Sequence, residues 1–312
     1  MSATVLVLVE TIGDYLPLLE DAGFNLIVAP TPQSRADAVR DHAEQITAVL
    51  TRGPLGLRAD EIDALPKLEI ITVIGAGYEQ VDLAAAQRRG IVVTNGAGVN
   101  ASSVADHALA LLLASVRNVP QLDALVRGNG WTRDMRPSLA GKRLGVLGLG
   151  AVGMAIAKRC ALGFDMHVSY HNRRPRPDVD YQYCATVLEL AAASDFLVVA
   201  TPGGSSTEHL VGSAELQALG SHGFIVNIAR ASVIDTAALL QALESGQIAG
   251  AGLDVFDDEP SVPDAFKTLH NVVLTPHVAG LSPDAVEATV VMVIENLRAH
   301  FAGLPVLTPI GA

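Results

Sequence analysis

Short apolar runs alternate with amphipathic, helix-like stretches along almost the whole chain of 312 residues. In the first third, the runs that predict strands are Val5–Val9, Asn25–Val28, Ile46–Leu50, Glu69–Val73 and Ile91–Thr94. The stretches that predict helices lie near Tyr15–Asp21, Ser34–His42, Ala59–Leu65 and Leu83–Arg89. Strands that alternate with helices form parallel sheets covered on both faces. The first third therefore predicts an α/β fold with a doubly wound parallel sheet.

A long helix-like segment follows residue 100. Val104, Ala108 and Leu111 recur at helical spacing, so this face is expected to meet a core or a partner. Ser103 is the expected N-cap, and Asp106 would complete a capping box three residues later. The helix is expected to fade near residues 118–120. A second helical stretch should then run to residue 127, followed by a loop over residues 128–137.

The alternation restarts at residue 142 and predicts a second sheet. Its expected strands are Arg143–Leu147, Met166–Tyr170, Phe196–Ala200, Phe224–Ile228, Gly250–Val255 and Val272–Thr275. A last helix, near Pro283 to His300, follows the final strand, where the chain could pack back onto the first domain. The pattern favours two domains, residues 1–98 with 285–312 and residues 99–284 inserted between them. Two domains are also the natural expectation for a chain of this length.

Charge and composition exclude several classes of function. The net charge of −12 argues against binding to nucleic acid or to an anionic membrane by general attraction, because both need a basic face. Cys160 and Cys184 have no metal-ligand spacing around them, so we expect no metal and two buried free thiols in a reducing compartment. The N-terminus lacks the features of a signal peptide, and no run of eighteen apolar residues occurs. These features predict a cytoplasmic protein.

A glycine-rich loop, Gly148-Leu149-Gly150-Ala151-Val152-Gly153, directly follows the predicted strand Arg143–Leu147 and precedes a helix-like run. Gly148 would permit a tight turn, Gly150 would let the backbone approach a pyrophosphate, and Gly153 would let the helix pack close to the strand. The helix N-terminus would then offer unpaired N–H groups to the anion. In this context the loop predicts a dinucleotide site. The alternative is a glycine-rich turn without a ligand.

The end of the next strand distinguishes NADP from NAD. NAD sites usually have an acidic residue about 20 residues after the glycine loop, which binds the ribose hydroxyls. Here the strand is followed by Asn172, Arg173 and Arg174. A carboxylate would repel a 2′-phosphate, whereas guanidinium groups can pair with it. We therefore predict NADP(H), with NAD(H) less preferred. The alternative is an ordinary solvated loop in which Pro175 and Pro177 end the strand.

Three polar segments follow the later strands, and ligands gather at such strand ends in open parallel sheets. They contain Arg230, Glu259 and His277. Reduction of a 2-oxo acid needs a cation for the substrate carboxylate, which suits the planar fork of Arg230. It also needs a proton donor for the carbonyl oxygen, which suits His277 because an imidazole titrates near neutral pH. Glu259 is the candidate to orient that imidazole. Taken one at a time, Arg230 could form an ordinary salt bridge, Glu259 could be a solvated acid and His277 could be a turn residue.

These segments, together with Gly75–Asp82 and Asn100–Leu113, resemble the D-isomer-specific 2-hydroxyacid dehydrogenase family over nearly the whole chain. Within that family the chain is most similar to the glyoxylate/hydroxypyruvate reductases, a branch that often uses NADPH. The resemblance implies two domains of Rossmann-like and flavodoxin-like topology with a cleft between them. It also implies a homodimer built around the coenzyme domain. The expected product is a D-2-hydroxy acid.

The resemblance implies substrate contacts for individual residues. Arg230 would bind the substrate carboxylate, together with the backbone amides of Ala76 and Gly77, and His277 would be the acid/base with Glu259 as its partner. Leu50 and Arg52 would line the substrate side, where Arg52 either reads a second anionic group or faces solvent. The loop that contains Trp131 could reach the neighbouring subunit.

The resemblance also implies cofactor contacts. Val104 would lie near the nicotinamide, Asp254 would bind its carboxamide, and Pro202 and Thr207 would flank the cofactor. The complete set of residues expected at the cofactor is Val104, Gly148, Leu149, Gly150, Ala151, Val152, Gly153, Asn172, Arg173, Arg174, Pro202, Thr207, Ile228, Ala229, Arg230, Asp254, His277 and Gly280.

The sequence departs from the family pattern at two positions, and it leaves two rival functions open. Ala231 and Asp165 stand where the family commonly has glycine. The first rival is an NAD-dependent branch of the same family, such as the phosphoglycerate dehydrogenases. Against it, the chain lacks the usual ribose-binding acid. The second rival is a nucleotide-sensing binding protein without activity, which a shared fold cannot exclude. Against that rival stands the intact set of Arg230, Glu259 and His277.

Overall fold

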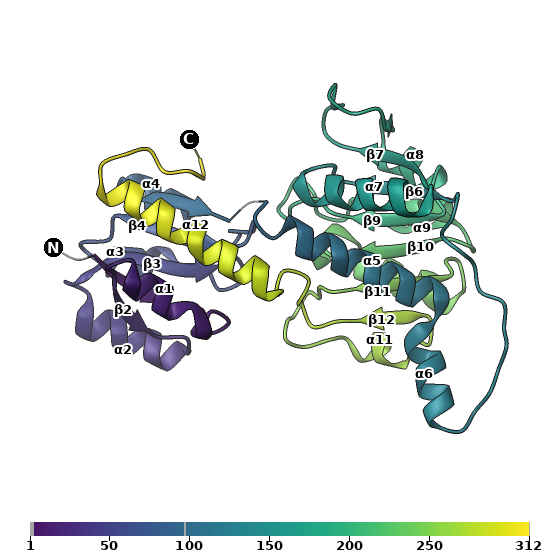
Figure 1. Cartoon of the computed structure of the whole chain (residues 1–312), viewed down its shortest axis with the longest axis horizontal. Helices are drawn as coiled ribbons and strands as arrows, with labels where there is room; N and C mark the ends of the chain where they lie inside the picture. Colours follow the sequence, from purple (N-terminus) through teal and green to yellow (C-terminus); the bar gives the residue numbers. More distant parts are fainter. Residues whose placement is uncertain (1–2, 97, 312) are drawn as a thin grey trace. The chain divides into compact units, whose positions relative to one another are not determined.

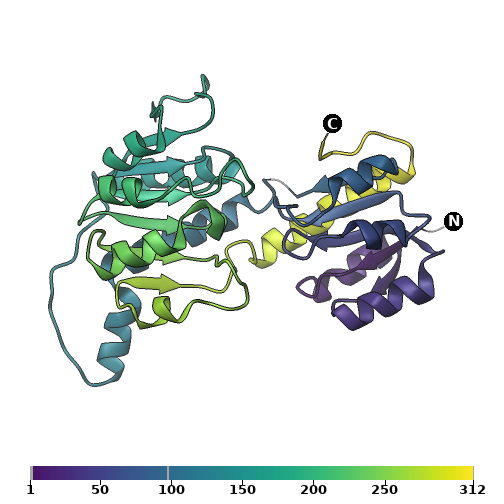
Figure 2. The same cartoon turned by 180° about the vertical axis from the view of Figure 1, so that it is seen from behind.

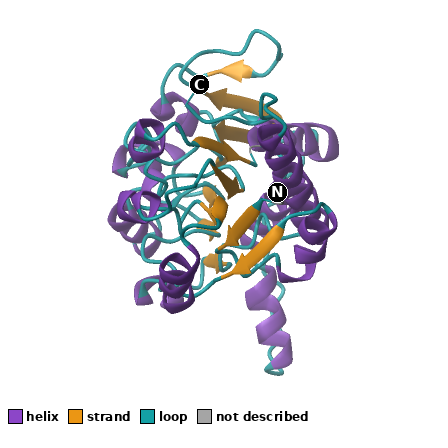
Figure 3. Ribbon diagram, turned by 90° about the vertical axis from the view of Figure 1, so that its left-hand side faces the viewer, coloured by secondary structure: helices purple, strands orange, loops and turns teal. Residues whose placement is uncertain are grey.

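The computed structural model describes residues 3–96 and 98–311, and it divides into two compact units (Figure 1). Unit 1 comprises Met1–Asn100 and Gly280–Ala312, and unit 2 comprises Ala101–Ala279. Each unit contains an all-parallel sheet, and helices lie on both sides of the strands (Figure 3). The predicted α/β fold with two doubly wound parallel sheets is therefore confirmed. All of the predicted strands are present, with ends within two residues of the expected positions.

The sheet of unit 1 has the strand order β2-β1-β3-β4-β5. Its strands are β1 (Thr4–Val7), β2 (Asn25–Val28), β3 (Ile46–Arg52), β4 (Ile70–Ile74) and β5 (Val92–Asn95). Its helices are α1 (Leu16–Asp21), α2 (Pro32–His42), α3 (Ala59–Asp63), α4 (Leu83–Arg88) and α12 (Pro283–Phe301), with a 3-10 turn, η1 (Gly13–Tyr15). Side chains alternate across β1. Val5 and Val7 pack with α1 and α12, and Leu6 packs with α2, α3 and α4 on the opposite face.

The sheet of unit 2 has the order β12-β11-β10-β9-β6-β7-β8. Its strands are β6 (Arg143–Leu147), β7 (His167–His171), β8 (Gln182–Tyr183), β9 (Phe196–Val199), β10 (Phe224–Asn227), β11 (Gly250–Leu253) and β12 (Val272–Leu274). Its helices are α5 (Ala101–Arg117), α6 (Val119–Arg127), α7 (Ala151–Phe164), α8 (Val187–Ala192), α9 (Ser213–Leu219), α10 (Thr236–Glu244) and α11 (Asp264–Thr268), with a 3-10 turn, η2 (Ala231–Val233). The two-residue strand β8 is too short to leave a sequence pattern, and it was not predicted.

Alternating side chains also build two cores around the sheet of unit 2. On β9, Phe196 and Val198 pack with α5 and α7, whereas Leu197 and Val199 pack with α8, α9 and α10. The back view shows α8, α9 and α10 on the face opposite to α5 and α7 (Figure 2). Both faces of these strands are buried, which explains why they read as continuous apolar runs in the sequence.

The predicted cap of the long helix is wrong. Helix α5 begins at Ala101, so Ser103 lies in its first turn, where its hydroxyl donates to the carbonyl oxygen of Ala279 at 2.7 Å. Asp106 pairs with Arg159 at 2.8 Å instead of closing a capping box. The expected break near residue 118 is confirmed, because Asn118 has a φ of 56° between α5 and α6. The local sequence assigns both polar side chains to a helix cap, but each of them bonds instead to a residue far along the chain.

No single helix among the described residues is long and apolar enough to span a bilayer. Helices α5 and α6 meet the length and composition criteria only as a pair, and a bend of 60° separates them. The core-facing residues of α5, such as Ala108 and Leu112, are buried inside unit 2.

Cys160 and Cys184 are free and buried, as predicted. Burial raises the pKa of the Cys160 thiol to about 12 and also raises the pKa of the Cys184 thiol, to which the charge of Glu189 adds. Both side chains are therefore neutral thiols near neutral pH and behave as small apolar groups.

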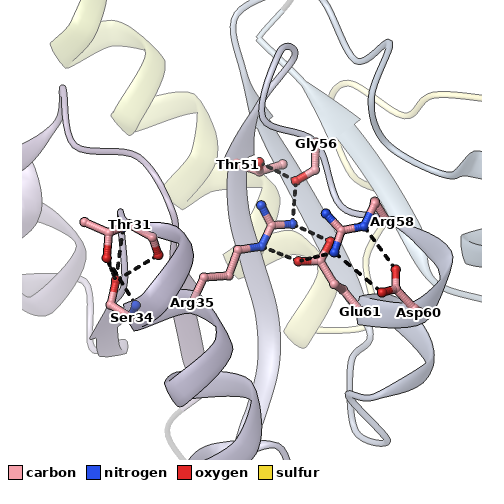
Figure 4. Close-up of polar contacts among 8 residues, drawn as sticks. All are labelled: Thr31, Ser34, Arg35, Thr51, Gly56, Arg58, Asp60 and Glu61. Atoms are coloured by element: carbon pink, nitrogen blue, oxygen red, sulfur yellow. Dashed lines mark hydrogen bonds and ion pairs between the residues drawn. The ribbon is translucent and has the colours of Figure 1, made fainter.

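A buried ion pair ties α2 to α3 in unit 1 (Figure 4). The Arg35 guanidinium lies 2.5 Å from Glu61 Oε1 through Nε and donates to Glu61 Oε2 through Nη2 at 2.7 Å. Nη2 also donates to the carbonyl oxygen of Gly56 at 3.2 Å, and the Thr51 hydroxyl donates to the same oxygen at 2.9 Å. The two charged side chains are only 11% and 12% exposed. The pair therefore fixes the loop after β3 against both helices.

Candidate active site

The glycine loop lies where the strand order of unit 2 reverses, between β6 and β9. Ligands of open parallel sheets bind at the carboxyl ends of strands at this point. Gly148 has a φ of +98°, and a Cβ there would lie 2.7 Å from the backbone nitrogen of Thr201 in the loop after β9. A Cβ at Gly153 would overlap the carbonyl oxygen of Gly148. Only glycine allows the backbone this close approach between loop, helix and neighbouring strand.

The space beside Gly150 fits a pyrophosphate. Gly150 is the N-cap of α7, and an added Cβ would meet nothing within 4 Å, so the backbone there is open to a ligand. The first N–H groups of a 14-residue helix follow at Ala151 and Val152, and such groups have no partner inside the helix. The residues present therefore match the requirements of a dinucleotide phosphate.

The loop after β7 is hydrogen-bonded to the glycine loop. Asn172 Oδ1 accepts a hydrogen bond from the backbone nitrogen of Leu149 at 2.7 Å, and Arg176 Nη1 donates to the Leu149 carbonyl oxygen at 2.9 Å. Arg176 also pairs with Asp178. Arg173 and Arg174 follow Asn172 in this loop and have exposed side chains. The sequence prediction missed Arg176, although the third arginine of the Arg-Arg-Pro-Arg run was the signal that could have revealed it.

The loop after β9 holds Pro202 and Thr207, both expected near the cofactor. The Thr207 hydroxyl donates to the carbonyl oxygen of Pro202 at 2.8 Å, which closes the loop on itself. Val104 lies on α5, is 7% exposed and packs in the core of unit 2. Pro202 and Thr207 follow β9 and therefore lie near the sheet edge at which β6 and β9 end.

The acid/base candidates meet in unit 2. His277 Nδ1 lies 2.7 Å from Glu259 Oε2, and both side chains are partly exposed. Glu259 is fixed on its other oxygen, because Oε1 accepts from the backbone nitrogen of Phe256 at 3.0 Å. The bond to Nδ1 leaves Nε2 as the ring nitrogen that can exchange a proton with a ligand. A carboxylate that orients an imidazole in this way is typical of acid–base catalysis.

Arg230 follows β10, next to the strand β11 that leads to Glu259. The segment is shaped by Asn227, which is 2% exposed and whose Nδ2 donates to the Arg230 carbonyl oxygen at 2.9 Å. Asn227 Oδ1 accepts from the backbone nitrogen of Ala229 at 3.0 Å, while Ile228 and Ala229 are buried. The three strands β10, β11 and β12 are adjacent and parallel, so their carboxyl ends bring the segments of Arg230, Glu259 and His277 to one edge.

The two departures from the family pattern differ in what they require of the backbone. Asp165 is the C-cap of α7 with a φ of 53°, the left-handed conformation for which glycine is favoured. Ala231 begins the 3-10 turn η2, so the chain after Arg230 turns without needing a glycine. Asp165 therefore carries backbone strain, whereas Ala231 does not occupy a left-handed position.

The predicted substrate residues Leu50, Arg52, Ala76 and Gly77 lie in unit 1, at the carboxyl ends of β3 and β4. Leu50 is fully buried, and its carbonyl oxygen accepts from the backbone nitrogen of Leu8 at 2.9 Å. Arg52 and Ala76 are exposed, and the Ala76 carbonyl oxygen accepts from Asn95 Nδ2 at 2.7 Å. Gly280 opens the second segment of unit 1.

A separate cavity of about 530 Å³ lies in unit 1 between α2 and α3, and its arginines suggest an anion site at first sight. Each of them is matched by carboxylates: Arg35 by Glu61, Arg58 by Asp60 and Glu61, and Arg40 by Asp37 and Asp41 (Figure 4 shows the first two). The positive charge is locally neutralised, so the cavity offers an anion little attraction. Among the described residues, no group of three or more His, Cys, Asp or Glu side chains could hold a metal ion.

Comparison with known proteins gives consistent matches. Residues 109–279 match the model of the D-isomer specific 2-hydroxyacid dehydrogenase, NAD binding domain. The chain is 39% identical to hydroxyphenylpyruvate reductase of Plectranthus scutellarioides over 99% of this chain and 100% of that protein. It is 38% identical to glyoxylate/hydroxypyruvate reductase A of Arabidopsis thaliana, with 96% of each chain covered.

The solved structures agree with the sequence relatives. One is the NADPH-dependent glyoxylate/hydroxypyruvate reductase of Sinorhizobium meliloti in complex with NADP and malonate. It is 37% identical, with a TM-score of 0.89, and the match covers 100% of this chain and 97% of that one.

Proposed function

The chain belongs to the D-isomer-specific 2-hydroxyacid dehydrogenase family, and we propose that it reduces a small 2-oxo acid, such as glyoxylate or hydroxypyruvate, to the D-2-hydroxy acid with NADPH. The observation that carries this proposal is the His277–Glu259 pair at the same sheet edge as the segment of Arg230, in a unit whose glycine loop fits a dinucleotide. Relatives of similar length are named as reductases of such acids, and one binds NADP.

Each residue has one task in the proposed reaction. Bound NADPH supplies the hydride that adds to the keto carbon of the substrate. Arg230 holds the substrate carboxylate through its planar fork and thereby orients the carbonyl group. His277 donates a proton from Nε2 to the carbonyl oxygen as negative charge develops there. Glu259 Oε2 accepts a hydrogen bond from Nδ1–H of His277, which fixes the orientation of the ring. Hydride and proton together convert the carbonyl group into an alcohol.

A substrate panel tests the proposal. Purified protein is mixed with NADPH or NADH and with glyoxylate, hydroxypyruvate, hydroxyphenylpyruvate or 2-ketogluconate, and the loss of reduced-nicotinamide absorbance is followed. We expect turnover with at least one of these acids and a higher kcat/KM with NADPH than with NADH. Tight NADPH binding without turnover of any 2-oxo acid would instead favour the nucleotide-sensing rival.

Arg173→Ala should raise the KM for NADPH about tenfold or more. The exposed guanidinium is proposed to pair with the 2′-phosphate, and a hydrogen bond to a charged group contributes roughly 1.5–3 kcal/mol. The KM for NADH on the same variant is the internal control and should stay within twofold, because NADH has no 2′-phosphate. An unchanged KM for NADPH would show that this loop does not read the phosphate.

We also propose that the chain forms a homodimer through unit 2 and acts in the cytoplasm. Support for the dimer comes from α6 and the loop after it, which extend from the body of unit 2 (Figure 1) and expose large apolar side chains. These are Val119, Leu125, Val126, Trp131 and Met135. Such a group of apolar side chains is typical of an interface. Sedimentation equilibrium should give twice the mass of the chain, and a monomer at micromolar concentration would contradict the dimer.

The proposed location in the cytoplasm is supported by the cysteines. Two free, neutral thiols suit a reducing compartment.

A further inference from the structure

The backbone of His277 is held in an unfavourable conformation. Its φ is 54°, in the left-handed region that residues with a Cβ seldom adopt. A residue in such a region costs on the order of 1–3 kcal/mol and persists only where its surroundings determine it. The turn that follows β12 must therefore be held by contacts outside itself.

Asp254, which directly follows β11, provides those contacts. Its Oδ1 accepts from the backbone nitrogen of Val278 at 3.0 Å, and its Oδ2 accepts from the backbone nitrogen of Ala279 at 2.9 Å. Both oxygens of one carboxylate thus bind the two residues immediately after His277. Asp254 is 1% exposed, so water does not compete for these bonds.

The Asp254 carboxylate is in turn held by two side chains that come from other elements. The Thr275 hydroxyl at the end of β12 lies 2.6 Å from Asp254 Oδ1. His107, on α5, places Nε2 at 2.9 Å from the Thr275 hydroxyl and at 3.3 Å from Asp254 Oδ1. The contacts therefore run from α5 through Thr275 and Asp254 to the turn that bears His277.

The direction of each hydrogen bond follows from counting protons. An ionised carboxylate only accepts, so the single hydroxyl proton of Thr275 must point to Asp254. Toward His107 the hydroxyl can then only accept, which requires the His107 proton to be on Nε2. The His107 N–H group therefore points at the Thr275 oxygen, with the Asp254 oxygen nearby.

We propose that His107 and Thr275 are positioning residues for the acid/base His277. They fix the rotamer of Asp254, and Asp254 holds the left-handed turn that sets where the His277 imidazole meets Glu259. This inference rests on the proposed reductase function for its kinetic consequence, and on geometry alone for its proton arrangement. Displacing a catalytic group by about 1 Å can lower the rate about 10²-fold, so a small rotation of this turn would lower kcat.

The kinetic test uses two matched pairs of variants in the full chain. Thr275→Val removes the hydroxyl at nearly constant volume and Thr275→Ser keeps it; His107→Leu removes the donor, whereas His107→Gln keeps an N–H group of similar reach. For Thr275→Val and His107→Leu we expect kcat to fall about tenfold while the KM for the 2-oxo acid stays within twofold. The serine and glutamine variants should retain most of kcat.

A merely structural role would give a different result. The valine and leucine variants would then be less stable but would keep kcat at temperatures where they are folded, as checked by circular dichroism. That outcome would overturn the proposal, as would equal losses in the conservative and the disruptive member of each pair. A rise in the substrate KM with unchanged kcat would also contradict it, because it would assign the network to binding.

The proton arrangement gives a test that needs no activity. Long-range ¹H–¹⁵N correlation spectra of ¹⁵N-histidine protein report which ring nitrogens carry a proton, and the His107 signals are assigned by their loss in His107→Gln. A proton on Nε2, in a neutral or a charged ring, is the expected result. A neutral ring protonated on Nδ1 alone would overturn the network. If the wild-type protein reduces no 2-oxo acid, the proposed function fails while this readout still decides the arrangement.

Discussion

His277→Ala is expected to lower kcat for the 2-oxo acid by about 10²–10⁴-fold, the range typical of a lost general acid. The variant removes the imidazole that is oriented by Glu259 through a bond of 2.7 Å, so no group remains at that place to protonate the developing alkoxide. The dissociation constant for NADPH, measured by fluorescence titration, should change much less, because the glycine loop and the loop after β7 are untouched. Steady-state kinetics at saturating NADPH measure the effect.

His270→Ala is the matched control for this experiment. His270 lies in the same unit, shortly before β12, and its side chain is exposed. Its removal should leave kcat within twofold. Full activity of His277→Ala would remove His277 from the acid/base role, whereas an equal loss in both variants would indicate damage to the β12 segment.

Arg35→Met is expected to lower the free energy of unfolding by about 3–5 kcal/mol, the usual effect of breaking a buried pair by removing one partner. Glu61 is 12% exposed and would lose the two guanidinium contacts at 2.5 and 2.7 Å. A largely buried carboxylate would remain between α2 and α3, and its one remaining cationic partner among the described residues would be the exposed Arg58 at 3.8 Å. Urea unfolding followed by circular dichroism measures the change, which should appear as an earlier transition of unit 1.

Two further variants make this stability prediction specific. Arg40→Met removes an arginine from the same helix whose side chain is 65% exposed, and this should change stability by less than about 0.5 kcal/mol because exposed ion pairs contribute little. The double variant Arg35→Met with Glu61→Gln should recover much of the loss, since the buried charge is then gone. Equal destabilisation by Arg35→Met and Arg40→Met would show that burial of the pair is not the cause.

The strands of both sheets and the place of the glycine loop could be predicted from the sequence because they depend on local patterns. A strand buried on both faces must be apolar along its length, as in Val5–Val9. In the glycine loop, Gly148 and Gly153 each meet a steric demand from nearby backbone, whereas Gly150 leaves open space beside the backbone. Residues at the ends of such strands can therefore be identified as site candidates from the sequence alone.

The polar contacts of the site could not be predicted in the same way. Ser103 was assigned to a helix cap, yet it bonds to Ala279, far along the chain. Arg176 reaches the glycine loop from a segment in which Asn172, Arg173 and Arg174 were expected at the cofactor and Arg176 was not. A polar side chain can be satisfied by many partners, and the local sequence does not say which of them the fold will bring near.

The sequence by itself determined the α/β architecture, the parallel sheets and the types of residue available for chemistry. These features depend on the spacing of apolar residues and on the steric freedom of glycine, both of which operate over a few neighbouring residues. Only the tertiary structure decided that His277 takes a left-handed backbone and that its ring meets Glu259. The same holds for Asp254, Thr275 and His107, which come together behind that turn. These contacts join residues from different strands and helices, so they exist only once the whole unit has packed.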